Sequence, residues 1–297
     1  MAIKDFKPML LTYESLMFLC VQFIALGTGV LLLNTGQAQL PPIEGGFWRL
    51  AQFLAAFLIA LVVIVLLLRY LKTPLSFGLF FAFLIFIGSQ TVFAALLSLS
   101  SNVLNDLTIL ILSIALAIGI IALRWWKPNL ITHNISIFLG VAGVAAILGT
   151  ALRPWPEIII LLIALSIYDF IAVFKTKTMV SMFKELLKRG APLAIIVPES
   201  PYQFTANVHK ISRAKLREKD RKVLMLGTGD LAFPALFAVS AYATAGLPAA
   251  LAIMAGSVVG LVFNHYLLMV KKFRFIPALP FIALFSIIGY VIAIFLL

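Results

Sequence analysis

The sequence predicts an all-α integral membrane protein with nine transmembrane helices, its N-terminus in the cytoplasm and its C-terminus outside. Composition, the spacing of apolar runs and the distribution of basic residues support this prediction. Hydrophobic residues make up 63% of the 297 residues, charged residues make up 11%, and the mean hydropathy is +1.13. This balance lies far outside the range of a soluble domain.

The helices are predicted from apolar runs of about 17 to 25 residues, the length that spans a bilayer. Such runs cover residues 13–33, 47–68, 75–99, 107–123, 130–150, 156–174, 223–244, 247–269 and 277–297. The seventh and eighth runs are separated only by the weak break at residues 245–248. A count of eight therefore stays open beside the count of nine.

The orientation is predicted from lysine and arginine, which accumulate on the cytoplasmic side of membrane proteins. With nine helices and a cytoplasmic N-terminus, Arg49 and Arg153 are the exceptions among the 23 basic residues, and all the others lie inside. One missed or invented helix would destroy this asymmetry. The net charge of +12 therefore reports orientation, and no nucleic-acid partner is expected.

A polar stretch, residues 175–222, divides the single membrane domain into a part before it, residues 1–174, and a part after it, residues 223–297. Residues 178–189 have apolar side chains at helical spacing with lysines between them, which predicts an amphipathic helix on the inner surface. Residues 191–198 are apolar and bounded by prolines, which is compatible with an exposed strand or a loop. Residues 210–222 are highly charged and are expected to face lipid headgroups.

Two aspartates, Asp169 and Asp230, lie inside apolar runs with no basic residue beside them. An ionisable side chain at membrane depth costs several kcal/mol unless it is paired or neutralised, so each indicates function. Asp169 precedes Lys175 by six residues and Asp230 follows Lys222 by eight, which places them about 9 and 12 Å inside the flanking charges. On antiparallel helices at similar depth they can form one shared site.

Two carboxyls that approach closely cannot both ionise cheaply, so one holds a proton while the other acts as a base. The charged member can then take a proton from a water that attacks a peptide carbonyl, while the protonated member donates to the developing oxyanion. Gly227 and Gly229 leave room beside Asp230 for another chain. Pro277 and Pro280 leave main-chain groups that an extended substrate could pair with, as in strand addition.

Three ordered motifs carry a resemblance: Tyr168-Asp169 in the sixth run, Gly227-Thr228-Gly229-Asp230 in the seventh, and Pro277-Ala278-Leu279 before the ninth. Together with the nine-helix layout, they resemble the presenilin and signal peptide peptidase family over essentially the whole chain. The resemblance implies intramembrane proteolysis of single-span proteins, with Asp169 and Asp230 catalytic. It also implies that the other motif residues shape the site or bind substrate.

The resemblance implies further properties. The N-inside orientation resembles presenilin, and the size suggests an archaeal homologue in a prokaryotic cell membrane that works without obligatory partner subunits; a homo-oligomer stays open. Thr228 stands where Gly-Leu-Gly-Asp is usual in the family, which bears on substrate preference. A second Pro-Ala-Leu, residues 234–236, lies within the seventh run and is not assigned to the motif. The loop at 175–222 lacks the long insertion in which presenilins cut themselves, so no required self-cleavage is expected.

Other residues receive structural interpretations. The three histidines, among them His133 and His265, show no metal-ligand spacing and are expected to be ordinary polar or packing residues, and neither a metal nor a cofactor is expected. Glu14 is expected to be shallow enough for water to reach. Glycines in the fifth and eighth runs predict close helix packing.

The main alternative function is a proton- or cation-conducting channel or transporter, because paired membrane carboxyls also serve such pathways. Against it, the two halves of the chain show no evident repeat, and both aspartates lie toward one face of the membrane. A non-catalytic scaffold, the third class, would not need both aspartates.

Overall fold

The computed structural model describes residues 8–38, 46–70, 74–174, 194–198, 223–270 and 277–296. The elements in chain order are α1 (Pro8–Asn34), α2 (Gly46–Tyr70), α3 (Pro74–Leu97), the 3-10 turn η1 (Ser98–Ser100), α4 (Asp106–Trp126), α5 (Leu130–Ala151), the π-helical turn η2 (Pro154–Ile158), α6 (Ile159–Phe174), β1 (Ala194–Pro198), β2 (Val223–Gly227), α9 (Thr228–Val270) and α10 (Leu279–Leu296). The amphipathic helix predicted at 178–189 and the charged segment 210–222 lie outside the described residues.

The described part of the chain is an all-α membrane protein apart from one small sheet. Seven of its helices are long and apolar enough to cross a bilayer: α1, α3, α4, α5, α6 together with η2, α9 and α10. The helix α2 has 25 residues, and its sequence is largely apolar from Leu50 to Leu68. The helix α9 contributes one continuous apolar stretch of 41 residues.

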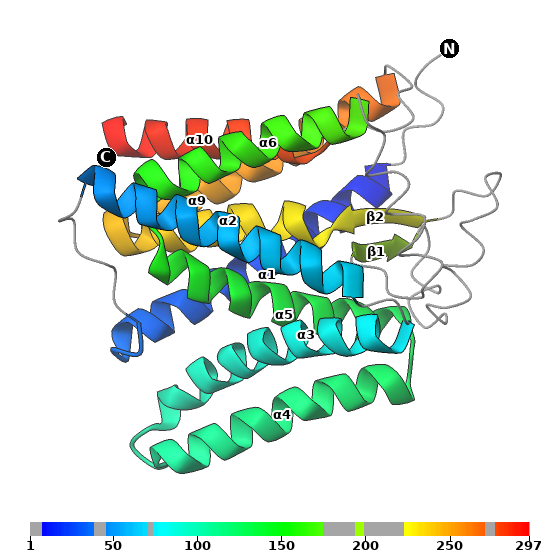
Figure 1. Ribbon diagram of the computed structural model, residues 1–297, viewed down its shortest axis with the longest axis vertical. Coiled ribbons are helices and arrows are strands. Elements are labelled where there is room, and N and C mark those ends of the chain that lie inside the picture. Colours follow the sequence, from blue (N-terminus) through cyan, green and yellow to red (C-terminus); the bar gives the residue numbers. More distant parts are fainter. Residues whose placement is uncertain are drawn as a thin grey trace.

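Gly246 divides α9 into a first half, residues 228–245, and a second half, residues 247–270. Its φ of 81° and ψ of −174° are non-helical, and a side chain at this position would strain the backbone. The chain reverses direction there, so that the second half runs back toward the end from which the first half came (Figure 1). The weak break at residues 245–248 thus coincides with a helical reversal.

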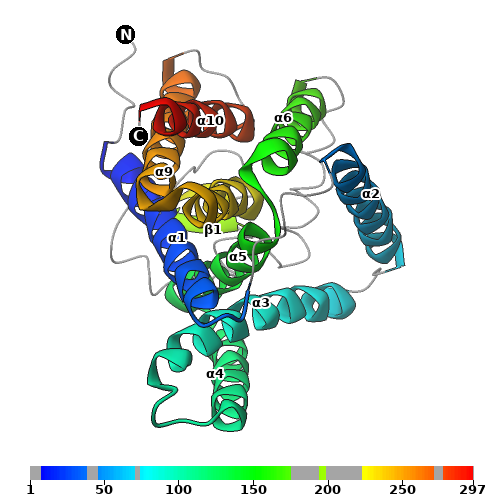
Figure 2. The ribbon, with the colours of Figure 1, turned by 90° about the vertical axis from the view of Figure 1, so that its left-hand side faces the viewer.

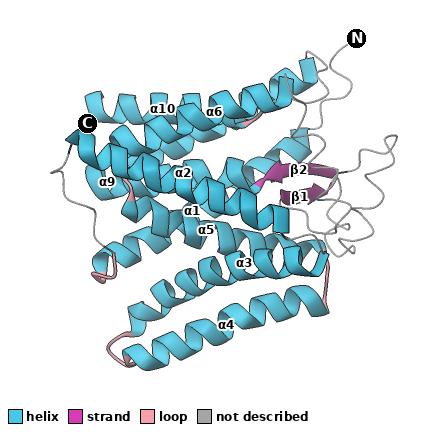
Figure 3. Cartoon of the chain, viewed as in Figure 1, coloured by secondary structure: helices cyan, strands magenta, loops and turns pink. Residues whose placement is uncertain are grey.

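The predicted start of the helix at 223–244 is wrong, because residues 223–227 form β2 instead. β2 pairs in antiparallel fashion with β1 to make a two-stranded sheet, with Ala194 opposite Gly227 and Ile196 opposite Met225 (Figure 3). The apolar residues of β2 extend the apolar run of α9, which hides the boundary in the sequence. Of the two alternatives for 191–198, the strand is correct for Ala194–Pro198.

The helices pack around α9, which contacts α1, α5 and α10, while α3 packs on α5 and α4, and α6 packs on α10 (Figure 2). Glycines allow the closest approaches. A Cβ on Gly260 would lie 2.6 Å from the carbonyl oxygen of Phe281 in α10, and one on Gly149 would lie 2.6 Å from that of Leu236. The close packing predicted for the glycines of the fifth and eighth runs is confirmed.

The end of the molecule that carries the sheet gathers the segments of interest. α6 ends there, the first half of α9 begins there from β2, and the second half of α9 returns to it (Figure 1). α1 begins at this end, whereas α10 ends at the opposite one (Figure 1). The end of α6 and the start of α9, which carry the two aspartates, therefore lie at the same end of the bundle.

Candidate active site

Asp169 lies on the inward face of α6. Its side chain is 9% exposed, and it shares this face with Leu162 and Ala172, which are also buried at helical spacing. Its sequence neighbour Tyr168 is 64% exposed on the outer side of the helix. Helical geometry thus turns the Asp169 side chain into the bundle and the Tyr168 side chain away from it.

Asp230 lies in the first turn of α9, three residues after Gly227, the last residue of β2. The backbone amide of Gly227 donates a hydrogen bond to the Asp230 carboxylate. This is the return contact of a capping box, in which an acidic side chain at the third helical position satisfies an amide at the helix start. The positive end of the helix dipole also favours negative charge here. Local structure therefore fixes the orientation of Asp230.

The carboxyl group of Asp230 interacts electrostatically with two other carboxyl groups, those of Asp169 and Glu14. α6 reaches this region by packing against α10, which itself packs along α9. The structure thus places Asp169, from the part of the chain before residues 175–222, within electrostatic range of Asp230, from the part after them.

The remaining predicted site residues lie at the starts of α9 and α10. Thr228 is half-buried and Gly229 is exposed in the first turn of α9. Pro277 and Leu279 are buried, and the half-buried Ala278 packs against the core. The carbonyl of Ala278 accepts a hydrogen bond of 3.1 Å from the Ile282 amide, which forms the first turn of α10.

A further carboxyl group that interacts with Asp230 was missed by sequence reasoning. Glu14 was expected to be within reach of water, but its side chain in α1 is 5% exposed. Its Oε2 lies 3.4 Å from Nδ1 of the equally buried His265 in the second half of α9. The signal that identified the aspartates, an ionisable residue within an apolar run, applies to both residues of this pair.

The outer edge of β1 is held by two consecutive residues of α5. His133 Nε2 donates to the Ala194 carbonyl over 3.0 Å, and the Asn134 side chain donates to the Ile196 carbonyl over 2.9 Å and accepts from the Ile196 amide over 3.1 Å. Main-chain groups alternate between the two sides of a strand, so Ile195 and Val197 bond to β2. By the same alternation, the amides of Met225 and Gly227 point away from β1.

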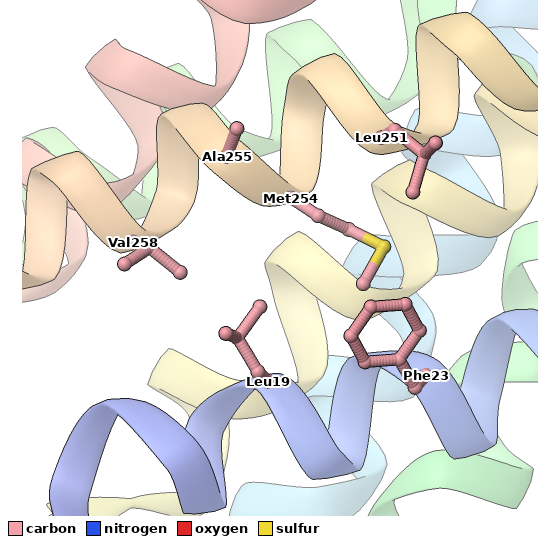
Figure 4. A pocket seen from close by; sticks show the side chains of 6 residues that line it. All are labelled: Leu19, Phe23, Leu251, Met254, Ala255 and Val258. Carbon is pink, nitrogen blue, oxygen red and sulfur yellow. The ribbon is translucent and has the colours of Figure 1, made fainter. Parts of the chain in front are cut away.

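An apolar groove between α1 and the second half of α9 is not a chemical site. It is lined by Leu19, Phe23, Leu251, Met254, Ala255 and Val258 (Figure 4). None of the predicted site residues lines it. Among the residues with described positions, no cluster of His, Cys, Asp or Glu could hold a metal ion.

Comparison with known proteins finds a matching family and similar solved structures. Residues 16–297 match the family described as "Signal-peptide peptidase, presenilin aspartyl protease". The chain is similar to a structure of a presenilin family intramembrane aspartate protease in space group C222, with 25% identity and a TM-score of 0.66 over 97% of this chain and 99% of that chain. A second such structure, in space group P2, has 25% identity and a TM-score of 0.64 over 95% and 96%. A search of curated proteins finds no match.

Proposed function

This chain belongs to the signal-peptide peptidase and presenilin family of intramembrane aspartyl proteases, and from that premise we propose that it cleaves single-span membrane proteins with Asp169 and Asp230. The single observation that carries the proposal is the electrostatic interaction between the carboxyl groups of Asp169 in α6 and Asp230 in α9. The end of α6 and the start of α9 lie at the same end of the bundle (Figure 1). The substrate bond lies within or near a transmembrane segment. The reaction needs no cofactor and no obligatory partner subunit.

In the proposed mechanism one carboxyl of the pair is ionised and the other is protonated. The ionised carboxylate removes a proton from a bound water, whose oxygen attacks the peptide carbonyl carbon. The protonated partner donates to the carbonyl oxygen as negative charge develops. Collapse of the tetrahedral intermediate breaks the carbon–nitrogen bond, and the amine leaves with a proton from the pair. The Gly227 amide holds the Asp230 carboxylate in place through this cycle.

We propose that the substrate binds as an added strand along the free edge of β2. Main-chain groups of Met225 point away from β1, and no other described strand pairs with them. A peptide on this edge would run toward Gly227 and the start of α9, and therefore toward Asp230. In this proposal the start of α10 at Pro277–Leu279 forms the other side of the substrate-binding site. Helical substrates would have to unwind locally before cleavage.

For the membrane arrangement we propose nine spans, with the N-terminus in the cytoplasm and the C-terminus outside. This proposal counts α2 as a full span and the halves of α9 as two. The reversal at Gly246 and the 25-residue length of α2 support it, as does the distribution of basic residues. The dyad then lies toward the cytoplasmic side, and in the sequence its two aspartates flank the basic segment 175–222.

The test is cleavage of a single-span reporter peptide by purified protein in liposomes, with product masses read by mass spectrometry. Asp169→Asn and Asp230→Asn should each lower the cleavage rate roughly a thousandfold or more, because each removes one member of the acid–base pair. Asp106→Asn is the matched control: Asp106 is exposed at the start of α4, and this variant should cleave at the wild-type rate.

Retained cleavage in either dyad variant would contradict the proposed roles of the aspartates. Absence of cleavage by folded wild-type protein across several reporters and lipids would favour the ion-pathway alternative, and proton or cation flux in the same liposomes would then be measured.

A further inference from the structure

The two-stranded sheet depends on α5 for its position. An isolated pair of strands is marginally stable in water, and β1 and β2 have no further strand beside them among the described residues. Asn134 acts as a third strand would, because its amide group both donates to and accepts from Ile196. His133 adds the bond to Ala194. His133 and Asn134 are buried, at 2% and 4% exposure, so bulk water does not compete for these hydrogen-bonding groups.

The hydrogen-bonded residues lead directly to Asp230. Ala194, which His133 holds, is the residue opposite Gly227 in the sheet register. β2 ends at Gly227 and α9 begins at Thr228, so no flexible residue separates strand from helix. The Gly227 amide then bonds the Asp230 carboxylate. Each link in this path is a hydrogen bond, a strand register or a direct covalent connection.

We propose that His133 and Asn134 are positioning residues for proteolysis: they fix the sheet, and through Gly227 the sheet fixes the Asp230 carboxylate. This inference rests on the proposed catalytic role of Asp230. It gives α5 a function in catalysis although α5 carries none of the three motifs. Closing the outer edge of β1 also leaves the edge of β2 as the one open to an added strand in the described part of the sheet.

The test uses Asn134→Leu, which removes both bonds to Ile196 at similar side-chain size, and the milder Asn134→Asp, which keeps the acceptor for the Ile196 amide. Ser136→Ala is the matched control, because Ser136 is equally buried on α5 but bonds only to Thr132 of its own helix. We expect Asn134→Leu to lower kcat roughly ten- to a hundredfold, the range for a misplaced catalytic group. KM should change much less, Asn134→Asp should lie between, and Ser136→Ala should match wild type.

A second readout does not depend on activity. Amide hydrogen exchange of intact protein in liposomes, read by mass spectrometry, should be about tenfold faster or more for residues 194–198 and 223–227 in Asn134→Leu. Exchange in α10 should not change. Faster exchange with normal kcat would overturn the proposal, and so would a fall in kcat without faster exchange, or a loss confined to KM.

The Asp230→Asn and Asn134→Leu variants distinguish a failure of the proposed function from a failure of the positioning role. If Asp230→Asn cleaves like wild type, the proposed function fails, and with it the link to catalysis, whatever the exchange data show. If Asp230→Asn is inactive and Asn134→Leu is folded and fully active, only the positioning proposal fails.

Discussion

Gly227→Ala tests the geometry of Asp230 with one added methyl group. A Cβ at residue 227 would lie 3.2 Å from Oδ2 and 3.8 Å from Cγ of Asp230. The first distance is tighter than ordinary van der Waals contact, so the carboxylate must move by a few tenths of an ångström. The φ angle of Gly227 is not positive, since among the glycines of the described segments only Gly36 and Gly246 have a positive φ. The substitution should therefore act on the carboxylate rather than on the backbone.

The expected magnitude follows from this displacement. A misplacement of about 1 Å can cost about a hundredfold in rate, so a few tenths of an ångström corresponds to a loss of roughly three- to sixfold in kcat. If the shift also breaks the bond from the Gly227 amide, a hydrogen bond to a charged group worth about 1.5 kcal/mol or more is lost. The loss then exceeds about tenfold.

The assay is reporter cleavage by Gly227→Ala and Gly229→Ala, with thermal unfolding of both variants measured alongside. A Cβ on Gly229 would meet Phe233 Cε2 at 3.7 Å, an ordinary contact, so the second variant should lose less activity than the first. Wild-type kcat in a folded Gly227→Ala protein, or the reverse order of the two variants, would refute the placement of the Asp230 carboxylate described above.

Three further predictions concern packing, a buried hydrogen bond and pH. Gly256→Leu should lower the free energy of unfolding by about 1–3 kcal/mol or prevent folding, because a side chain there collides with the Phe285 carbonyl. The control is Gly119→Ala, which adds a methyl group where the structure has open space and should leave the free energy of unfolding unchanged or slightly higher. Ser257→Ala should lower the free energy of unfolding by about 1–3 kcal/mol, because it leaves the buried Gln22 amide, 3.0 Å from Ser257 Oγ, without that partner. In denaturation curves, adding Gln22→Leu to this variant should recover part of the lost free energy. If the effects of the two substitutions simply add, the two residues are not coupled. Cleavage should show a bell-shaped dependence on pH, since it requires one protonated and one ionised carboxyl in the pair; a rate that rises to a plateau without falling would contradict the shared-proton mechanism.

Much of the fold could be predicted because membrane helices are apolar over a fixed length. The same rule identified Asp169 and Asp230, since an acid within such a run is costly enough to need an explanation. The strand β2 was missed because Val223–Gly227 is as apolar as the helix that follows it, and length alone does not separate the two. Its partner β1 lies beyond residues 199–222, so local periodicity carries no information about the pairing.

The contacts made by buried polar residues could not be predicted either. Asn134 is hydrogen-bonded to a strand 62 residues further along the chain. Glu14 in α1 contacts His265 in α9, and these two helices lie near opposite ends of the sequence. Each residue alone looks like an ordinary polar residue near a helix end. Only tertiary structure shows that Asn134 bonds the edge of β1 and that Glu14 lies within electrostatic range of Asp230.

The reversal of α9 at Gly246 has a consequence for how the protein enters its membrane. The two halves of α9 are joined without a polar loop, and neither Ala245 nor Leu247 offers a charge to either surface. No hydrophilic segment therefore has to cross the lipid between them. We expect the insertion machinery to receive this 41-residue stretch as a preassembled helical hairpin, so that the segment bearing Asp230 and the segment that packs on α10 arrive in the bilayer together during synthesis.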